Sequence, residues 1–190
     1  MLPTVGVLAL QGDVREHLWA LERLGVPTCL VRLPEDLEGI GGLVIPGGES
    51  TTIGRLAERF GVLGPLRAAL LAGLPTLATC AGMILVAGSV VEGDQPLLGV
   101  LDILVRRNAF GRQNESFEMD LEVKGLEQPF RGVFIRAPWV EKVGADVEVL
   151  ARVGKHPVMV RSGTVMAASF HPELTGDSRI HRLWLQGGEG

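Results

Sequence analysis

Short apolar runs alternate with amphipathic stretches over the first half of the chain, and this alternation constrains the fold more than any other feature. The runs cover residues 5–10, 27–31, 42–45 and 75–79. They are too short for typical helices and contain few polar side chains, as strands buried on both faces do. The pattern predicts an α/β fold with a mostly parallel central sheet flanked by helices.

Helical patterns fill the segments between these runs. A helix with its apolar residues on one face follows the first run. Residues 51–71 predict two helical pieces, interrupted near Gly61 and at Gly64-Pro65. Residues 81–87 predict a short buried helix. Each helix would return the chain to the start of the next parallel strand.

The pattern changes after about residue 100, where strand candidates follow one another with little helix between them. We interpret them as later strands of the sheet plus an antiparallel extension. A last helix over residues 178–185 precedes a glycine-rich tail that we expect to fray. No linker divides the chain, so we expect a single domain over residues 1–190. The strand candidates are residues 100–105, 117–123, 133–135, 147–153, 158–160 and 165–170.

Charge and composition argue against several classes of protein. The chain has 18 Lys and Arg against 22 Asp and Glu, a net charge of −4, with no dense basic run, so we expect no nucleic-acid partner. Residues 68–91 carry no charge, but Gly73 and Pro75 break the stretch, so we expect buried core and no membrane span. The N-terminal residues lack the basic region of a signal peptide. Two cysteines, each in an apolar run, fit the reducing cytoplasm.

Cys80 lies where a predicted strand meets a predicted helix. A nucleophile on such a sharp turn is exposed above the sheet, and small neighbours permit the crowded backbone. The usual turn has glycine two residues before and two after the nucleophile. Gly82 fits this pattern, whereas Ala78 replaces the first glycine. The alternative is that Cys80 is a small buried apolar residue.

The segment Ser169-Phe170-His171-Pro172-Glu173 includes the end of the last strand candidate, residues 165–170, which is followed by His171-Pro172-Glu173. Residues two apart in an extended segment point the same way, so Glu173 can reach one nitrogen of His171. A cysteine that attacks an acyl carbon needs such a base, and the carboxylate fixes the imidazole tautomer. A zinc deaminase would need a Pro-Cys-x-x-Cys pair that this sequence lacks. A surface turn is the structural alternative.

A third segment, residues 45–52 (IPGGESTT), runs from a predicted strand through a glycine pair into a helix. Glycines let a ligand approach the backbone, and the Gly48 N–H could join the Ala81 N–H in an oxyanion hole. A phosphate loop is one alternative, although the segment lacks the Gly-Lys-Ser/Thr ending. A plain turn with a helix cap is the other.

Taken together, six segments carry a resemblance to a known family. Read in order over residues 9–175, the chain resembles the glutaminase subunits of pyridoxal 5'-phosphate synthase, which are class I glutamine amidotransferases. The cysteine turn and His-Pro-Glu are shared across class I, and three of the segments narrow the resemblance to this subunit. The six segments are ALQGDVREH, PGGESTT, TCAGM, RNAFGRQ, VFIRAP and SFHPELT.

The resemblance implies a flavodoxin-like class I amidotransferase fold and the hydrolysis of L-glutamine to glutamate and ammonia through a triad of Cys80, His171 and Glu173. It implies a partner, the (β/α)₈-barrel synthase subunit that receives the ammonia, and neither a cofactor nor a metal. Charge matching assigns the α-ammonium of glutamine to Glu49 and its α-carboxylate to an arginine such as Arg107, although the sequence does not fix which arginine binds it. The structural alternative is that Arg106 and Arg107 only solvate the end of a strand. The implied glutamine contacts are Gly48, Glu49, Ser50, Arg107, Ile135 and Arg136.

Other assignments stay open at the level of sequence. The chain could feed ammonia to another acceptor, as in imidazole glycerol phosphate synthesis, or act as a stand-alone cysteine hydrolase or stress protein. A regulatory module without catalysis is disfavoured because all three triad positions are filled. We expect Cys29 in the core, the other histidines on the surface, and a partner contact near the Gln11-Gly12 loop and residues 13–17. Those histidines are His17, His156 and His181.

Overall fold

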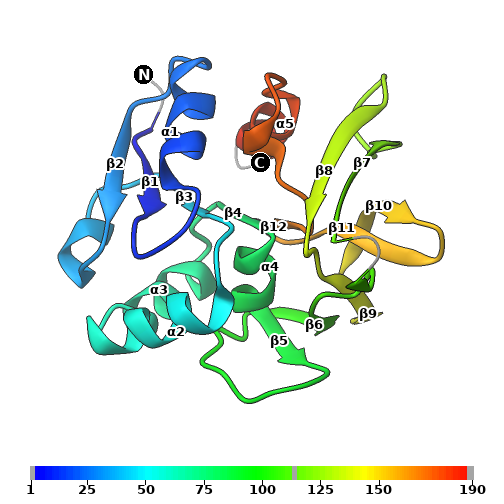
Figure 1. The fold of residues 1–190 in the computed structure, drawn as a ribbon. Coiled ribbons are helices and arrows are strands. Elements are labelled where there is room, and N and C mark those ends of the chain that lie inside the picture. Colours follow the sequence, from blue (N-terminus) through cyan, green and yellow to red (C-terminus); the bar gives the residue numbers. More distant parts are fainter. Residues whose placement is uncertain (1–2, 113–114, 188–190) are drawn as a thin grey trace.

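A seven-stranded sheet forms the centre of the computed structural model, which describes residues 3–112 and 115–187 (Figure 1). Five neighbouring strands run parallel, and two antiparallel strands extend one edge. The α/β fold with an antiparallel extension is therefore confirmed. The sheet consists, in spatial order, of β10 (Glu148–Val153), β11 (His156–Ser162), β12 (Val165–Ala168), β4 (Thr76–Thr79), β3 (Gly42–Ile45), β1 (Val5–Leu8) and β2 (Thr28–Val31).

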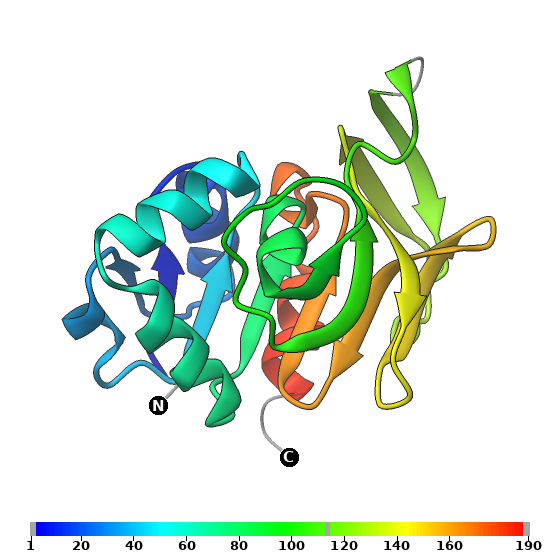
Figure 2. The ribbon, with the colours of Figure 1, turned by 90° about the horizontal axis from the view of Figure 1, so that it is seen from below.

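The parallel part has the flavodoxin strand order, in which the chain crosses from one side of β1 to the other. Helices cover both faces of the sheet, as Figures 1 and 2 show from perpendicular directions. The first face carries α1 (Val14–Glu22) and α5 (Arg179–Gly187). The second carries α2 (Ser50–Arg59), α3 (Leu63–Leu71) and α4 (Ala81–Val86).

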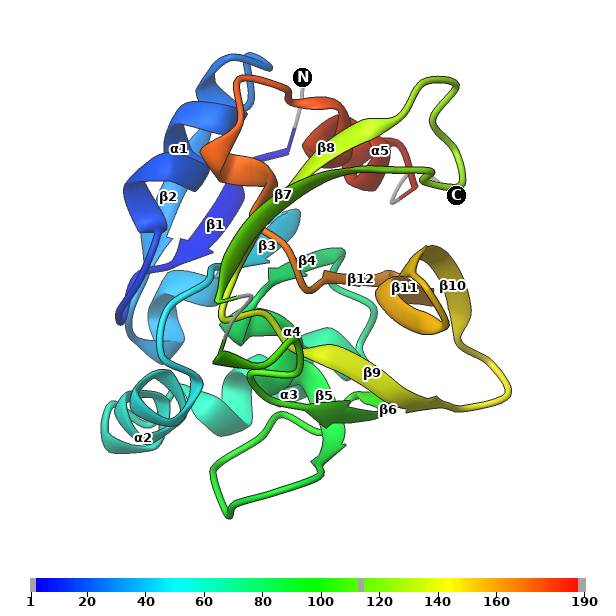
Figure 3. The same ribbon diagram turned by 45° about the vertical axis from the view of Figure 1, so that its right-hand side comes forward.

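Two smaller sheets join the central one. The first contains β5 (Ala87–Val90), β6 (Leu101–Arg106) and β9 (Trp139–Val143), and the second is a hairpin of β7 (Ser116–Leu121) and β8 (Phe130–Ile135). Figure 3 shows this hairpin beside α5, where Phe130 and Phe134 share a core with Trp184. Sequence reasoning missed β5, because it continues the apolar run of α4, and β9, because its alternating pattern is short.

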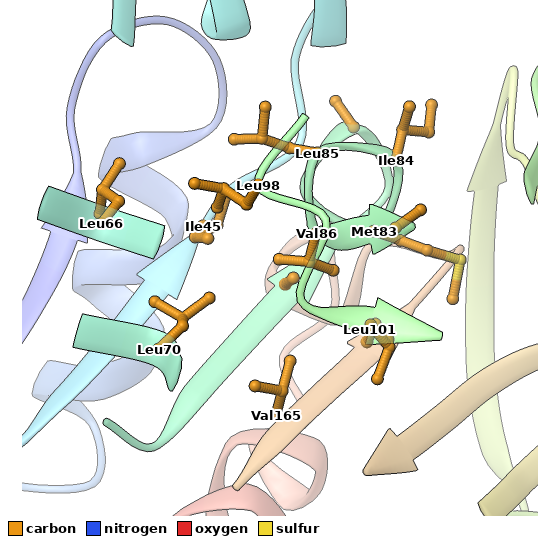
Figure 4. Close-up of a cluster of buried hydrophobic side chains, with 14 of the residues drawn as sticks. Ile45, Leu66, Leu70, Met83, Ile84, Leu85, Val86, Leu98, Leu101 and Val165 are labelled. Atoms are coloured by element: carbon orange, nitrogen blue, oxygen red, sulfur yellow. The ribbon is translucent and has the colours of Figure 1, made fainter. Parts of the chain in front are cut away.

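One core fills the space between the sheet and α2, α3 and α4 (Figure 4). The α4 side chains Met83, Leu85 and Val86 are fully buried there. Leu66 of α3 and Ile45 of β3 pack in the same cluster. Since α4 is buried on every side, it has no polar face, which explains the uncharged stretch around it.

Several local expectations need correction. β2 is the edge strand of the sheet, and its side chains are mostly half-buried or exposed, so it is not the buried strand we expected. Cys29 on β2 is partly exposed for the same reason, so it is not a core residue.

Gly64 and Pro65 do not interrupt a helix, because they lie in the first turn of α3, where proline is tolerated. Gln113 of the motif RNAFGRQ and the tail beyond Gly187 lie outside the described residues.

Within residues 3–112 and 115–187, the helices are all too short or too polar to cross a lipid bilayer. The uncharged stretch over residues 68–91 is divided among α3, β4, α4 and β5, as the glycine and proline within it suggested.

Gly82 allows α4 to approach the sheet closely. A Cβ at this position would clash with the carbonyl oxygen of Ile45 on β3. We expect Gly82→Ala to lower the free energy of unfolding by about 1–3 kcal/mol, since a packed backbone must move. Gly64→Ala is the matched control, because a Cβ there meets no atom within 4 Å, and it should leave stability unchanged or slightly increased. Urea unfolding of both variants measures the difference, and equal stabilities would contradict this account of Gly82.

Candidate active site

Cys80 connects β4 to α4 through a sharply turned backbone. Its φ of 49° and ψ of −106° are unusual for a residue with a side chain. The turn is held because the Cys80 N–H donates to the Ala168 carbonyl of β12 at 2.8 Å. Strain of this kind costs on the order of 1–3 kcal/mol and is typical of functional sites. Ala78, which replaces the usual glycine, is paired inside the sheet on both sides, so a methyl group is tolerated there.

His171 and Glu173 follow β12 and come together as the spacing predicted. The Nδ1 atom of His171 lies 2.7 Å from Oε1 of Glu173. Both residues are only 5% exposed, and a 3₁₀ turn over Pro172–Leu174 fixes their relative position. The carboxylate can therefore accept the Nδ1 proton, which leaves the other ring nitrogen free for an acid–base role.

Asp13 is a second carboxylate at the same nitrogen, which sequence reasoning did not assign to the site. Its Oδ2 lies 3.2 Å from His171 Nδ1, and the residue is partly exposed at the start of α1. Asp13, His171 and Glu173 offer ligand atoms within 4.8 Å of one another, a grouping that could hold a metal ion. The same grouping is explained without a metal if the Nδ1–H of His171 is shared between the carboxylates of Glu173 and Asp13. A metal ion bound at Nδ1 would replace that hydrogen bond.

The proton affinity of His171 follows from these partners. Burial opposes the charged imidazolium, but hydrogen bonds with Asp13, Cys80 and Glu173 outweigh it and raise the pKa of His171 to about 12. Burial also raises the pKa of Glu173, against the effect of the His171 hydrogen bond. Cys80 contributes to this shift through its hydrogen bond with His171, so at neutral pH the imidazole holds a proton next to the sulfur.

The glycine pair after β3 lies against this histidine. A Cβ on Gly47 would lie 2.6 Å from Cε1 of His171, so only glycine fits. The Gly47 carbonyl accepts a hydrogen bond from the Asp13 N–H at 2.9 Å. The Glu49 N–H donates to Oε1 of Gln11 at 2.7 Å. Gly48 is thus held between two contacts to residues 11–13.

Glu49 and Arg107 pair with each other across the site. Arg107 Nη2 donates to Glu49 Oε1 at 3.1 Å, and Glu49 also caps α2 by accepting from the Thr51 and Thr52 N–H groups. Partial burial opposes ionisation of Glu49, but the Thr52 and Thr51 hydrogen bonds and the Arg107 charge lower its pKa. Ser50 is buried, and its hydroxyl donates to Gln95.

The remaining predicted contacts approach from β8. The Ile135 carbonyl lies 3.8 Å from the Cys80 sulfur. Arg136 follows at a φ of 45° and is exposed. Arg107 and Arg136 line a cavity of about 840 Å³. The residues that line this cavity do not include Cys80 or His171, so the predicted triad lies outside it.

Two histidines that we expected at the surface are fully buried behind the triad. His17 on α1 and His181 on α5 are both 0% exposed, and their rings lie 3.0 Å apart from Nδ1 to Nε2. The expectation was wrong, because His17 shares the inward face of α1 with Leu21, four residues on, and that spacing could have placed it. His17 therefore cannot contact a partner, whereas Gln11 and Arg15 remain exposed. His156 is partly exposed and stacks on Trp139.

Burial of these histidines makes stability depend on pH. Burial lowers the pKa of His181 to about 4, against about 6.5 in an unfolded chain, so the unfolded state binds more protons between these values. The contribution of neutral His181 to the free energy of unfolding is fully present above pH 6.5, and it falls by about 3 kcal/mol as the pH drops to 4. We expect His181→Gln to unfold in urea with a weaker loss of stability over this range. His156→Gln should keep the wild-type slope, and identical slopes for all three proteins would contradict the assignment.

Comparison with known proteins identifies the family. The profile of the SNO glutamine amidotransferase family matches residues 7–188. "Pyridoxal 5'-phosphate synthase subunit PdxT" of Frankia alni is 61% identical over 186 residues, which cover 96% of this chain and 94% of the relative. The protein of the same name from Mycolicibacterium vanbaalenii is 57% identical, with 96% of each chain covered.

Solved structures agree with this result. A crystal structure of a glutamine amidotransferase matches with a TM-score of 0.93 and 55% identity, covering 98% of this chain and 99% of the other. PurLQS from Thermotoga maritima shares the fold, with a TM-score of 0.69 and 20% identity over 100% of this chain and 98% of that one. The chain belongs to the SNO glutamine amidotransferase family.

Proposed function

We propose that this protein hydrolyses L-glutamine to L-glutamate and ammonia, and that Cys80, His171 and Glu173 carry the reaction. One observation supports the assignment most directly. A strained strand-to-helix turn presents Cys80 beside a histidine whose Nδ1 is held 2.7 Å from a buried carboxylate. Membership of the glutamine amidotransferase family supports the substrate, because such enzymes release ammonia from the glutamine side chain.

In the first half of the reaction, His171 holds the proton that the Cys80 thiol has given up, and the Cys80 sulfur attacks the carboxamide carbon of glutamine. The C=O electrons move onto oxygen, where the Gly48 and Ala81 N–H groups are the proposed donors to the oxyanion. When the C–N bond breaks, His171 gives its proton to the departing nitrogen and ammonia leaves. A thioester between Cys80 and the glutamyl group remains.

In the second half, His171 removes a proton from water, which attacks the thioester carbon. The C–S bond breaks, glutamate leaves, and the proton taken from water stays on His171 beside the released Cys80 sulfur, as before the reaction. Glu173 accepts the Nδ1 proton of His171 throughout, so the ring keeps one orientation and its positive charge is balanced.

Glu49 and Arg107 are the proposed contacts for the charged end of glutamine, beside Ser50, Ile135 and Arg136. Free glutamine is a zwitterion, and the pair offers one charge of each sign at 3.1 Å. Arg106 is the poorer candidate, because it pairs with Glu141 of β9 and with Glu92, which follows β5. When glutamine binds, Glu49 and Arg107 would exchange their contact with each other for contacts with the charged groups of the substrate.

The ammonia is proposed to pass to a pyridoxal 5'-phosphate synthase subunit, a (β/α)₈ barrel, in a cytoplasmic complex. The relatives named as subunits of that synthase cover nearly the whole chain. The exposed Gln11-Gly12 loop is the proposed contact surface. Because Gln11 holds the Glu49 N–H, a partner that moves this loop would also move Gly48. Unpaired thiols at Cys29 and Cys80 fit a reducing compartment.

Loss of the sulfur tests the proposed chemistry. We expect Cys80→Ala to abolish glutamate release while glutamine binding by calorimetry remains, because the thiol forms the bond but does not recognise the substrate. Release should be measured for the chain alone and with an equimolar synthase subunit, which we expect to raise the wild-type rate. Cys29→Ala is the control with unchanged activity. Turnover by Cys80→Ala close to the wild-type rate would remove Cys80 from the mechanism.

A comparison of variants at Arg107 and Arg106 tests which arginine contacts the substrate. We expect Arg107→Met or Glu49→Gln to raise KM for glutamine roughly 10- to 100-fold, as the loss of one charge-assisted contact does. Arg106→Met removes an arginine that lines the same cavity and should change KM by less than about twofold. Steady-state kinetics with the synthase subunit measure all three. A KM increase for Arg106→Met alone would assign the carboxylate contact to the other arginine.

A further inference from the structure

Two buried histidines connect the interior of the protein to the proposed triad. His17 on α1 and His181 on α5 approach from the same side of the sheet (Figure 1). Their rings are inclined at 59°, with Nδ1 of His17 3.0 Å from Nε2 of His181. Neither ring is accessible to solvent. Glutamine cannot touch this pair, so any effect on the reaction must pass through another residue.

The other nitrogen of His17 faces the carboxylate of the triad. His17 Nε2 lies 3.0 Å from the Thr79 hydroxyl and 3.5 Å from Oε2 of Glu173. The Oε1 atom of Glu173 is occupied by His171, whereas Oε2 is buried and has no hydrogen bond of normal geometry within the described part of the chain. A carboxylate oxygen in such a place needs a nearby positive dipole.

The hydrogen bonds of both rings select one tautomer of His17. Burial lowers the pKa of both histidines, so each neutral ring carries one proton. If His17 carries it on Nε2, its N–H points toward Thr79 and Glu173, and its bare Nδ1 accepts from His181 Nε2–H. The reverse assignment would set a lone pair of His17 against the Glu173 carboxylate.

His181 supports the same choice independently. Its Nδ1 is buried without a hydrogen-bond partner among the described residues. In the first assignment this nitrogen is a bare acceptor. In the reverse assignment it would be a buried N–H without an acceptor, which native structures tolerate less well than a free lone pair.

We propose that His17 is a positioning residue for glutamine hydrolysis: its Nε2–H holds the Glu173 carboxylate ionised and oriented, and His181 fixes the tautomer that makes this possible. The proposal rests on the proposed function. It lengthens the proposed series of contacting residues to His181, His17, Glu173, His171 and Cys80, from the core to the reactive sulfur. The other groups that act on this set are Asp13 at the start of α1 and Arg23 at its end, which faces His181.

Two substitutions at His17 separate its two contacts. The amide of Asn reaches about as far as Nδ1, so His17→Asn keeps an acceptor for His181 and removes the donor to Glu173. The amide of Gln reaches about as far as Nε2, so His17→Gln keeps that donor. With the synthase subunit present, we expect His17→Asn to lower kcat roughly 10- to 100-fold with KM within about twofold, as the loss of a residue that orients an active-site histidine does. His17→Gln should recover most of the rate.

The pH profile and a double-mutant cycle distinguish positioning from general support of the fold. Loss of the donor favours protonated Glu173, so the acidic limb of kcat should move to higher pH in His17→Asn and stay in place in His17→Gln. In a Glu173→Gln background, His17→Asn should cause little further loss. His156→Asn, which alters a histidine stacked on Trp139, is the control with wild-type rate and profile.

Nitrogen NMR of the wild-type histidine side chains tests the tautomer even if His17→Asn fails to fold. We expect a neutral His17 ring at pH 7 with its proton on Nε2. A proton on Nδ1, an unshifted acidic limb in folded His17→Asn, or an equal loss of rate with and without Glu173 would overturn the proposal. Absence of glutamate release from the wild-type complex would instead contradict the proposed function itself.

Discussion

The parallel pairing of β3, β4 and β12 is the constraint on which the candidate site depends. Parallel strands end at the same edge of a sheet, so the segments that follow Ile45, Thr79 and Ala168 meet there. Those segments supply the glycine pair, Cys80 and His171, although the first and the last of them lie more than 120 residues apart along the chain. Cross-strand hydrogen bonds fix their spacing before any side chain contributes.

The sequence was sufficient to predict the elements that depend on strong local patterns. Continuous apolar runs identified β1, β3 and β4, and the His-Pro-Glu spacing placed Glu173 against His171. Weaker patterns failed. β9 is short and only partly buried, and β5 follows α4 without a polar break, so periodicity could not separate them. The division of the later strands among three sheets depends on pairing partners, which one strand's sequence does not specify.

The site shows a similar division between what sequence could and could not predict. Residue type and spacing indicated the nucleophile and the base, because that chemistry needs few groups in a known arrangement. His17, Asp13 and Thr79 came to the site through tertiary contacts between α1, β4 and the turn after β12. A histidine on an apolar helix face can be neutral and hydrogen-bonded inside a protein, so its polar character misled the surface assignment.

The helix cap provided by Glu49 has a consequence for substrate affinity. The same carboxylate that accepts the Thr51 and Thr52 N–H groups at the start of α2 is the proposed partner of the glutamine ammonium. If the substrate draws the carboxylate away, the first turn of α2 loses its cap, which is worth about 1 kcal/mol. Saturation would then require a higher glutamine concentration than a rigid site would. The rate of glutamine hydrolysis would accordingly keep responding to the cellular glutamine concentration up to higher values.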